Sequence, residues 1–261
     1  MNVDKLNGQE VLPRESVPFD RLEIDDVTTG YSSLSVVSNV SLSVHVGEVV
    51  LLTGHNGAGK SCLVETIFGL VPLKGGRVIW SNEDVSGKRP RALLKRGVVL
   101  VPQGGGIVKN LTVWENMELV APRLARNYVR GNSEAEDDFG FEVLNRFSLI
   151  SERRDQIAGS LSGGEQRIVS IVRALLRKPR ILIIDEPFLG LSGLSSDVVL
   201  DLIDYLRNTK LSLGVLIVEQ QLFRLVGRLD RYYVMRQGRI ERKGQASELW
   251  ALSPEELWSL S

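Results

Sequence analysis

One octapeptide, Gly54-His55-Asn56-Gly57-Ala58-Gly59-Lys60-Ser61, limits the possible folds of this chain more than any other segment. It has the pattern G-x-x-x-x-G-K-[ST], and it lies between an apolar run at residues 48–53 and a helical pattern at residues 60–70. A strand, a glycine-rich turn and a helix in this order direct backbone N–H groups and a helix N-terminus at an anion. Lys60 adds a cation for the β- and γ-phosphates of a nucleotide, and the Ser61 hydroxyl adds an oxygen ligand for Mg²⁺. The alternative is a glycine-rich turn that binds nothing, but the flanking strand and helix favour a nucleotide site.

Strand-like and helical patterns alternate along most of the chain, which predicts an α/β fold with a parallel core sheet. Period-two patterning at residues 22–46 predicts antiparallel strands, and residues 104–160 show only helical patterns, around 114–120 and 141–147. We therefore expect an antiparallel β subdomain and an inserted helical subdomain at about 104–160. Together they form one nucleotide-binding domain at 21–261, preceded by a flexible extension at residues 1–20. The remaining strands are expected at 77–80, 98–101, 181–184, 215–218, 232–235 and 239–242, and further helices at 164–176 and 195–207.

The composition excludes several classes of protein. The 261 residues include 32 basic and 32 acidic ones, so no basic excess points to a nucleic-acid partner. No apolar run approaches the roughly 18 to 20 residues that a membrane-spanning helix needs. Cys62 is the single cysteine, which excludes an intramolecular disulfide and suits a reducing compartment.

A second motif, Leu161-Ser162-Gly163-Gly164-Glu165-Gln166, precedes the buried strand pattern Ile181-Leu182-Ile183-Ile184-Asp185-Glu186-Pro187. Ser162 is placed to cap the following helix, and the two glycines let the backbone approach a ligand closely. With the phosphate loop upstream, this segment resembles the signature of the ABC ATPases. The resemblance extends over nearly the whole chain from about residue 22, and it implies the P-loop ABC ATPase fold. In that family the signature completes the ATP site of a partner subunit.

The resemblance also implies roles for individual residues with ATP and Mg²⁺. Tyr31 is expected to stack on adenine, although a half-buried strand tyrosine is an alternative. Gln103 is expected to contact Mg²⁺ and the attacking water, and Asp185 is expected to contact a water bound to Mg²⁺. Glu186 is the expected general base, and the alternative for Glu186 is an ion pair at the end of the strand. The expected ligands of Mg²⁺ are therefore Ser61, Gln103 and Asp185. The expected nucleotide contacts are Tyr31, Gly54, His55, Asn56, Gly57, Ala58, Gly59, Lys60, Ser61 and Cys62, with Ser162, Gly163, Gly164 and Glu165 acting on the partner's nucleotide.

The chain departs from the usual family pattern at three positions. Cys62 replaces the hydroxyl residue that commonly contacts an α-phosphate oxygen, and a thiol is a weaker donor. Ser192 stands where many relatives have aspartate. Gln220 stands where most members have a switch histidine, and we expect its amide to sense the γ-phosphate without carrying a proton. The alternative is that Gln220 caps a following helix at residues 222–226.

Two of these departures coincide with one subfamily. Glu186-Pro187-x-Leu189-Gly190-Leu191 and Val218-Glu219-Gln220 resemble the smaller ATPase of importers for branched-chain or other hydrophobic amino acids, and the urea and amide importers look similar. The resemblance implies a peripheral subunit at the cytoplasmic face of the membrane. Its partners would be a second ABC ATPase, two transmembrane permease subunits and, indirectly, an extracytoplasmic solute-binding protein. We expect a heterodimer of ATPases, with a homodimer as the alternative.

Two other functions stay open at the level of the sequence. One is a non-transport ABC ATPase, although the chain lacks the tandem ATPase units or long coiled coils of the ribosomal and DNA-repair members. The other is a regulatory subunit that binds ATP with negligible turnover, which the missing histidine would allow.

Overall fold

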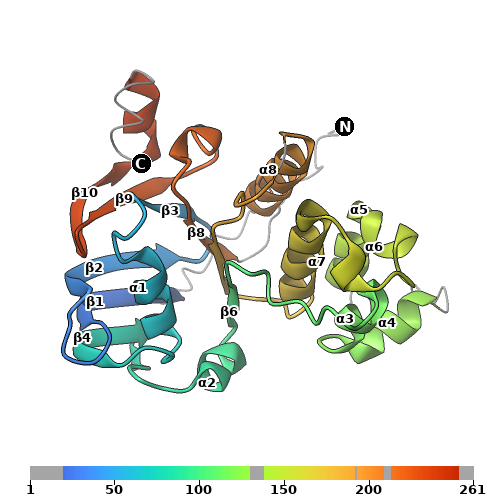
Figure 1. Cartoon of the computed structure of the whole chain (residues 1–261), viewed down its shortest axis with the longest axis horizontal. Helices are drawn as coiled ribbons and strands as arrows, with labels where there is room; N and C mark the ends of the chain where they lie inside the picture. The colour runs from blue at the N-terminus through green and yellow to red at the C-terminus, as the bar shows by residue number, and fades with distance from the viewer. Residues whose placement is uncertain (1–19, 130–137, 192, 209–212, 253–261) are drawn as a thin grey trace, which may run out of the picture.

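The central sheet of the molecule has six strands in the order β10-β9-β3-β8-β7-β6 (Figure 1). The computed structural model describes residues 20–129, 138–191, 193–208 and 213–252 of the chain. Strands β6, β7, β8, β3 and β9 run parallel to their neighbours, and β10 pairs antiparallel with β9 at one edge. These strands are β3 (Val49–Thr53), β6 (Val98–Val101), β7 (Ile181–Asp185), β8 (Gly214–Val218), β9 (Arg231–Arg236) and β10 (Arg239–Gln245).

Continuous apolar runs form the middle of this sheet. Every residue of β3, β7 and β8 is buried, as expected for parallel strands that are covered on both faces. Alternate residues of β3 face different sides: Val49 and Leu51 belong to one apolar core, and Val50 and Leu52 to the other. The predicted parallel core sheet is therefore confirmed, with one antiparallel edge strand.

A second sheet, in the order β2-β1-β4-β5, covers one face of the central sheet together with the helix that follows the phosphate loop. Its strands pair antiparallel, as predicted, and its apolar side chains share the core of Val50 and Leu52. The elements of this layer are β1 (Arg21–Thr29), β2 (Val37–His45), α1 (Lys60–Ile67), β4 (Leu73–Trp80), β5 (Glu83–Asp84) and α2 (Pro90–Lys95).

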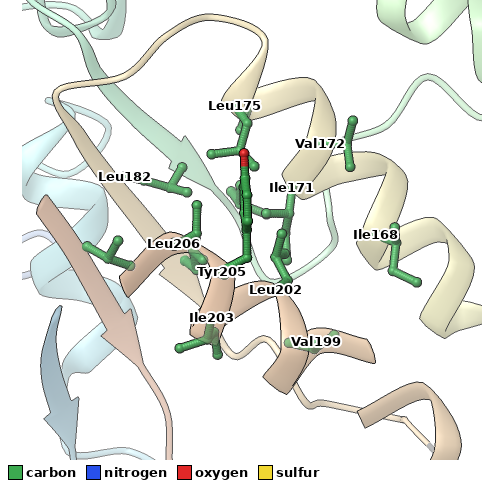
Figure 2. Packing of buried hydrophobic residues seen from close by; sticks show 14 of the residues in the cluster. Ile168, Ile171, Val172, Leu175, Leu182, Val199, Leu202, Ile203, Tyr205 and Leu206 are labelled. Carbon is green, nitrogen blue, oxygen red and sulfur yellow. The ribbon is translucent and has the colours of Figure 1, made fainter. Parts of the chain in front are cut away.

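Helices cover the opposite face. Helix α7 (Gly163–Leu175) lies beside α8 (Gly193–Asn208), and their apolar side chains interlock, as Figure 2 shows for Ile171 and Leu202. Beyond α7 lie the helices of the segment predicted to be an inserted helical subdomain; they share the core of Val49 and Leu51. These are α3 (Val113–Glu118), α4 (Pro122–Val129), α5 (Asp138–Arg146) and α6 (Leu149–Glu152), followed by the 3₁₀ turn η1 (Ala158–Ser160).

Several predicted boundaries were wrong. The helix expected at 60–70 ends at Ile67, because Gly69 adopts a φ of 66° and its N–H donates to the carbonyl of Thr66 at 2.9 Å, which terminates the helix. The strand expected at 77–80 begins at Leu73, and β5, α2, α4 and α6 were not predicted. The helix expected at 222–226 is a 3₁₀ turn, η2 (Leu222–Arg224), and a second such turn is η3 (Ala246–Ala251). The expected extension at residues 1–20 lies almost wholly outside the described residues.

Within the described residues, no helix is both long enough and apolar enough to span a bilayer.

Candidate ATP site

The glycine-rich loop connects the end of β3 to the start of α1, as predicted. Gly54, Gly57 and Gly59 have φ angles of 144°, 81° and 101°, which residues with a side chain rarely adopt. A Cβ atom at Gly54 would lie 2.0 Å from the carbonyl oxygen of Met235 on β9, so this position also has no space for a side chain. The loop is thus held in the conformation that turns N–H groups towards an anion.

Lys60 is the cation of this loop, and its side chain is 5% exposed. Its Nζ donates to the carbonyl oxygens of Gly54 at 2.5 Å and His55 at 3.1 Å. Burial lowers the pKa of Lys60, while the carboxylates of Glu186, Glu219 and Asp185 act in the opposite direction. The structure therefore brings the predicted phosphate-binding lysine close to the acidic ends of β7 and β8.

Asp185 is the last residue of β7 and is 5% exposed. Burial raises its pKa to about 6, with a further contribution from the Glu186 carboxylate, and a hydrogen bond with Ser61 opposes the shift. Its Oδ1 is buried and has no hydrogen-bond partner among the described residues. A buried carboxylate oxygen without a partner, next to a serine hydroxyl, fits a hard divalent cation with oxygen ligands. Ser61, Asp185 and the amide oxygen of Gln103 would hold Mg²⁺ here.

Replacing Asp185 by asparagine should stabilise the metal-free protein at neutral pH. The pKa of Asp185 in the folded chain, about 6, lies above the ordinary value of 3.8. Between about pH 4 and about pH 6 the folded chain therefore keeps a proton that the unfolded chain has lost. The free energy of unfolding of the wild type therefore falls as the pH rises from about 4 to about 6, whereas asparagine has no such loss. We expect Asp185→Asn to be more stable by about 1–3 kcal/mol at about pH 7.5 and by much less at about pH 4.5. Urea denaturation in the presence of a chelator measures this, and an equal difference at both pH values would contradict it.

Gln103 and Glu186 meet although they follow different strands. Gln103 follows β6 and Glu186 follows β7, and the Nε2 of Gln103 donates to the Oε2 of Glu186 at 2.7 Å. The contact forms because β6 and β7 are parallel neighbours, with Val101 paired to Ile184, so their carboxyl ends lie together. At this contact the partner of the Glu186 carboxylate is an amide and not a cation.

Tyr31 lies in the turn after β1, and 52% of it is exposed. The alternative of a half-buried strand tyrosine was therefore wrong. Its hydroxyl donates to the Oε2 of Glu65 on α1 at 2.9 Å, and this hydrogen bond raises the pKa of Tyr31 to about 12. The ring is thus exposed and held beside the helix of the phosphate loop, and stacking on adenine stays a prediction.

Cys62 lies one residue beyond the predicted Mg²⁺ ligand Ser61, in the first turn of α1, and is 6% exposed. Burial raises the pKa of its thiol. The side chain therefore remains a neutral, weak donor, and its contact with an α-phosphate stays a prediction. Ser192, the second departure from the family pattern, lies outside the described residues.

Ser162 is the N-cap of α7, as predicted. Its hydroxyl accepts from the N–H of Glu165 at 3.3 Å, and the Glu165 carboxylate accepts from the N–H of Ser162 at 2.8 Å. Ser162 and Gly163 are exposed, whereas Gly164 is buried. The signature does not join this chain's own phosphate loop on one face, because α7 belongs to the core of Val49 and α1 to that of Val50, on opposite sides of the sheet.

The loop after β8 contradicts the alternative that was considered for Gln220. The N-cap of η2 is Gln221 and has no side-chain cap, so the alternative that Gln220 caps the next helix was wrong. The carboxylate of Glu219, which is 4% exposed, accepts from the N–H groups of Gln220 at 2.7 Å and Gln221 at 3.0 Å, and from that of Phe188 at 3.3 Å. Glu219 therefore fixes the backbone of the predicted switch residue. The role of the Gln220 side chain stays a prediction.

Sequence reasoning missed three residues that shape the site: Glu65, Arg167 and Glu219. Glu65 and Glu219 position Tyr31 and Gln220, as described above. Arg167 on α7 donates to the carbonyl oxygens of Gln103 at 2.6 Å and Glu186 at 3.1 Å. No local signal in the sequence marks Arg167, because it directly follows Glu165 and Gln166 at the polar start of α7.

Known proteins with this arrangement carry ATP sites. The sequence pattern of the ABC transporter family matches residues 37–189. The high-affinity branched-chain amino acid transport ATP-binding protein BraG of Pseudomonas aeruginosa is 34% identical over 222 residues, which cover 84% of this chain and 90% of that protein. The lipopolysaccharide export system ATP-binding protein LptB of Escherichia coli K12 is also 34% identical, over 87% of this chain and 92% of that protein.

Solved structures agree with this assignment. The ADP conformation of an ATP-binding cassette of an ABC transporter superimposes with a TM-score of 0.73 at 29% identity, and the match covers 92% of this chain and 98% of that one. This agreement in fold accompanies a phosphate loop, a signature and an Asp-Glu strand end in the places that the sequence predicted. The chain therefore belongs to the ABC transporter family and is one of its ATP-binding, ATP-hydrolysing subunits.

Proposed function

We propose that this chain is an ATPase subunit of an importer for branched-chain or other hydrophobic amino acids. The observation that carries the proposal is the switch loop, in which Glu219 fixes the backbone of a glutamine at the position where most members have histidine. The Val218-Glu219-Gln220 pattern, with glutamine in that position, resembles the smaller ATPase of those importers. The resemblance to BraG, whose name gives branched-chain amino acids, supports the same cargo.

In this proposal the chain works in a head-to-tail pair with a second ATPase, at the cytoplasmic face of the membrane and against two permease subunits. The exposed start of α7 would meet the γ-phosphate held by the partner, with the Ser162 hydroxyl and N–H groups of the first helical turn as donors. The partner's signature would complete this chain's own site in the same way. A second, distinct ATPase is proposed as the partner, and a solute-binding protein would deliver the cargo to the permeases.

The residues of the site would then divide the chemistry of ATP hydrolysis. Lys60 and the loop N–H groups bind the β- and γ-phosphates, and Mg²⁺ held by Ser61, Asp185 and Gln103 would neutralise charge on the phosphate oxygens. Glu186 accepts a proton from the water that attacks the γ-phosphorus. The bond from the γ-phosphorus to the bridging oxygen breaks, and ADP and phosphate leave.

Export of lipopolysaccharide is the second candidate function, because LptB matches this chain at the same sequence identity as BraG. The two candidates differ in their membrane partners and in what stimulates ATP turnover. An importer ATPase is stimulated through its permeases by a loaded solute-binding protein, whereas an exporter ATPase is stimulated by the cargo on its own side of the membrane.

Purification of the full chain from native membranes, with its partners identified by mass spectrometry, tests the proposal. The complex is then placed in liposomes, and ATP hydrolysis is measured with the co-purifying or co-encoded binding protein and leucine, isoleucine or valine, against urea and lipopolysaccharide. We expect two permeases, a second ATPase and stimulation by a branched-chain amino acid. Stimulation by urea or by lipopolysaccharide would replace the proposed cargo with that one, and capture of ribosomes or DNA-repair proteins would exclude transport.

Replacement of Ser162 by arginine should act on the partner's site and not on this chain's own. The larger cationic side chain would fill the space at the start of α7 that the partner's nucleotide needs, while α1, the helix that begins at Lys60, packs on the other side of the sheet. We expect the isolated variant to bind ATP within about twofold of the wild type, while turnover of the assembled complex falls by about 100-fold or more. Equilibrium titration with labelled ATP and a steady-state ATPase assay measure the two effects.

Ser151→Arg is a matched control, because Ser151 is an exposed serine on α6 outside the signature. Its substitution should leave both ATP binding and turnover close to the wild type. If Ser162→Arg weakened ATP binding by the isolated chain as severely as loss of Lys60 does, the head-to-tail arrangement would be wrong.

A further inference from the structure

Arg167 is a buried cation at the junction of two loops of the site. It lies on α7, five residues after Ser162, and is 6% exposed. Its Nη1 donates to the carbonyl oxygen of Pro102 at 3.0 Å, and its Nη2 donates to those of Gln103 at 2.6 Å and Glu186 at 3.1 Å. One planar guanidinium thus bonds the main chain directly after β6 and directly after β7. A lysine could not reproduce this, because its ammonium is a point donor and not a planar fork.

The main chain at Glu186 needs such support. Glu186 has a φ of 48°, in the left-handed region that residues with a side chain rarely adopt and that costs conformational energy. Its N–H donates to the carbonyl oxygen of Val218 at 2.8 Å, and its own carbonyl oxygen accepts from Arg167. The peptide groups on both sides of the Glu186 Cα atom are therefore held by hydrogen bonds. The direction of the Glu186 side chain follows from this backbone.

The side chains of Gln103 and Glu186 are bonded to each other, so Arg167 holds the carbonyl groups of both members of that pair. Displacement of the guanidinium would move the two residues relative to one another. In the proposed reaction Glu186 takes the proton of the attacking water, and proton transfer requires atoms within hydrogen-bond reach. The hydrogen bonds that Arg167 donates within the described part of the chain all go to main-chain carbonyl groups, so we infer that it acts by positioning.

Helix α7 has a polar stripe that extends the contact between Arg167 and the segment after β6. Ser170 and Arg173 follow Arg167 at intervals of three residues; the Ser170 hydroxyl donates to the carbonyl oxygen of Gly105, and Arg173 Nη2 donates to that of Gly106 at 2.5 Å. The apolar stripe of α7, which includes Ile171, faces α8 in Figure 2. The segment at residues 102–106 is thus attached to α7 along its length, while α7 is packed against the rest of the molecule.

We propose that Arg167 is a positioning residue that sets Glu186 and Gln103 for hydrolysis. Through it, α7 links the signature at its N-terminus to the general base of the chain's own ATP site. A shift of α7 when Ser162 meets the partner's nucleotide is transmitted through the guanidinium to the carbonyl group of Glu186. This inference rests on the proposed function, because it takes Glu186 as the base.

The test compares Arg167→Lys and Arg167→Met in the assembled complex with its partners. We expect kcat to fall by about 10-fold for Arg167→Lys and by about 100-fold for Arg167→Met, with KM for ATP within about twofold of the wild type. The matched control is Arg173→Lys, because Arg173 also bonds the 102–106 segment from α7 but touches neither Gln103 nor Glu186. Its kcat should stay within about threefold of the wild type.

A double variant separates this inference from the function on which it rests. Adding Arg167→Lys to Glu186→Gln should cause no further loss of turnover, since the group that Arg167 positions is already gone. If Glu186→Gln alone hydrolyses ATP at the wild-type rate, the base is wrongly assigned. If Glu186→Gln is inactive but Arg167→Lys keeps the wild-type kcat, or Arg173→Lys loses as much as Arg167→Lys, the role of Arg167 is overturned. Arg167→Lys decides this even if Arg167→Met does not fold.

Discussion

Glu186→Gln should leave ATP bound and nearly abolish its hydrolysis. The side chain sits at the end of β7 and accepts a hydrogen bond from the Nε2 of Gln103 at 2.7 Å. A glutamine amide has the same shape and can still accept that bond through its oxygen, but it cannot take a proton from water. We expect kcat of the assembled complex to fall by about 10²- to 10⁴-fold, the range that general-base catalysis contributes.

ATP affinity of the same variant should change little, because the phosphates are held by the glycine-rich loop and by Lys60. Removal of one carboxylate from the vicinity of Asp185 and Lys60 makes the site less negative, so any change in affinity should be towards tighter binding. Trapping of a closed, ATP-bound pair is the second expected result, since hydrolysis is what removes the bridging γ-phosphate.

Single-turnover ATPase rates and equilibrium binding of labelled ATP measure the two effects. Glu241→Gln is a suitable control, because Glu241 is an exposed carboxylate on β10 that pairs with Arg236. A wild-type rate for Glu186→Gln would refute Glu186 as the base. It would favour hydrolysis in which no side chain acts as a general base. Loss of ATP binding would instead point to a role of Glu186 in holding the nucleotide.

The fold could be predicted largely because its main elements carry their information locally. The strand β3 is one apolar run, the phosphate loop has its glycines at fixed spacing, and α7 begins with a capping box that reads directly from Ser162 and Glu165. Helix α2 was missed because it has six residues of which only Leu93 is buried, so no periodicity develops. Short elements of this kind are decided by tertiary packing and not by their own pattern.

The site was predicted less completely, and the reason is again physical. Residues that contact phosphate or metal belong to motifs with fixed spacing, whereas the residues that hold them act over long separations in the sequence. Tyr31 bonds Glu65 across 34 positions, and Arg167 bonds Gln103 across 64. An arginine on a helix normally predicts a solvated side chain, and only the fold reveals that Arg167 is buried between two loops. The alternative that Gln220 caps the following helix failed for a local reason, because the Glu219 carboxylate accepts from the N–H groups of Gln220 and Gln221.

Lys60→Ala should have the largest effect on ATP binding. In the structure Nζ of Lys60 is satisfied by the carbonyl oxygens of Gly54 and His55, and its burial lowers the pKa of the ammonium. Phosphate oxygens would replace these neutral acceptors with charged ones, and hydrogen bonds to charged groups contribute about 1.5–3 kcal/mol each. Loss of one to two such bonds removes about 1.5–6 kcal/mol, which predicts a fall in ATP affinity of about 10- to 10⁴-fold at about 1.4 kcal/mol per factor of ten.

Lys74→Ala provides the matched control for this prediction. Lys74 also donates from Nζ to a carbonyl oxygen, that of Leu34, but it lies on β4 outside the glycine-rich loop. Its removal takes away the same charge from the chain, and so it corrects for any general electrostatic effect on an anionic ligand. Equilibrium titration with labelled ATP should therefore show a large loss of ATP affinity for Lys60→Ala and a change of less than about threefold for Lys74→Ala.

Equal losses of affinity for the two variants would mean that net charge, and not the loop, governs nucleotide binding. Unchanged affinity in Lys60→Ala would remove the phosphate-loop assignment itself, because no other side chain of the described loop carries a permanent positive charge.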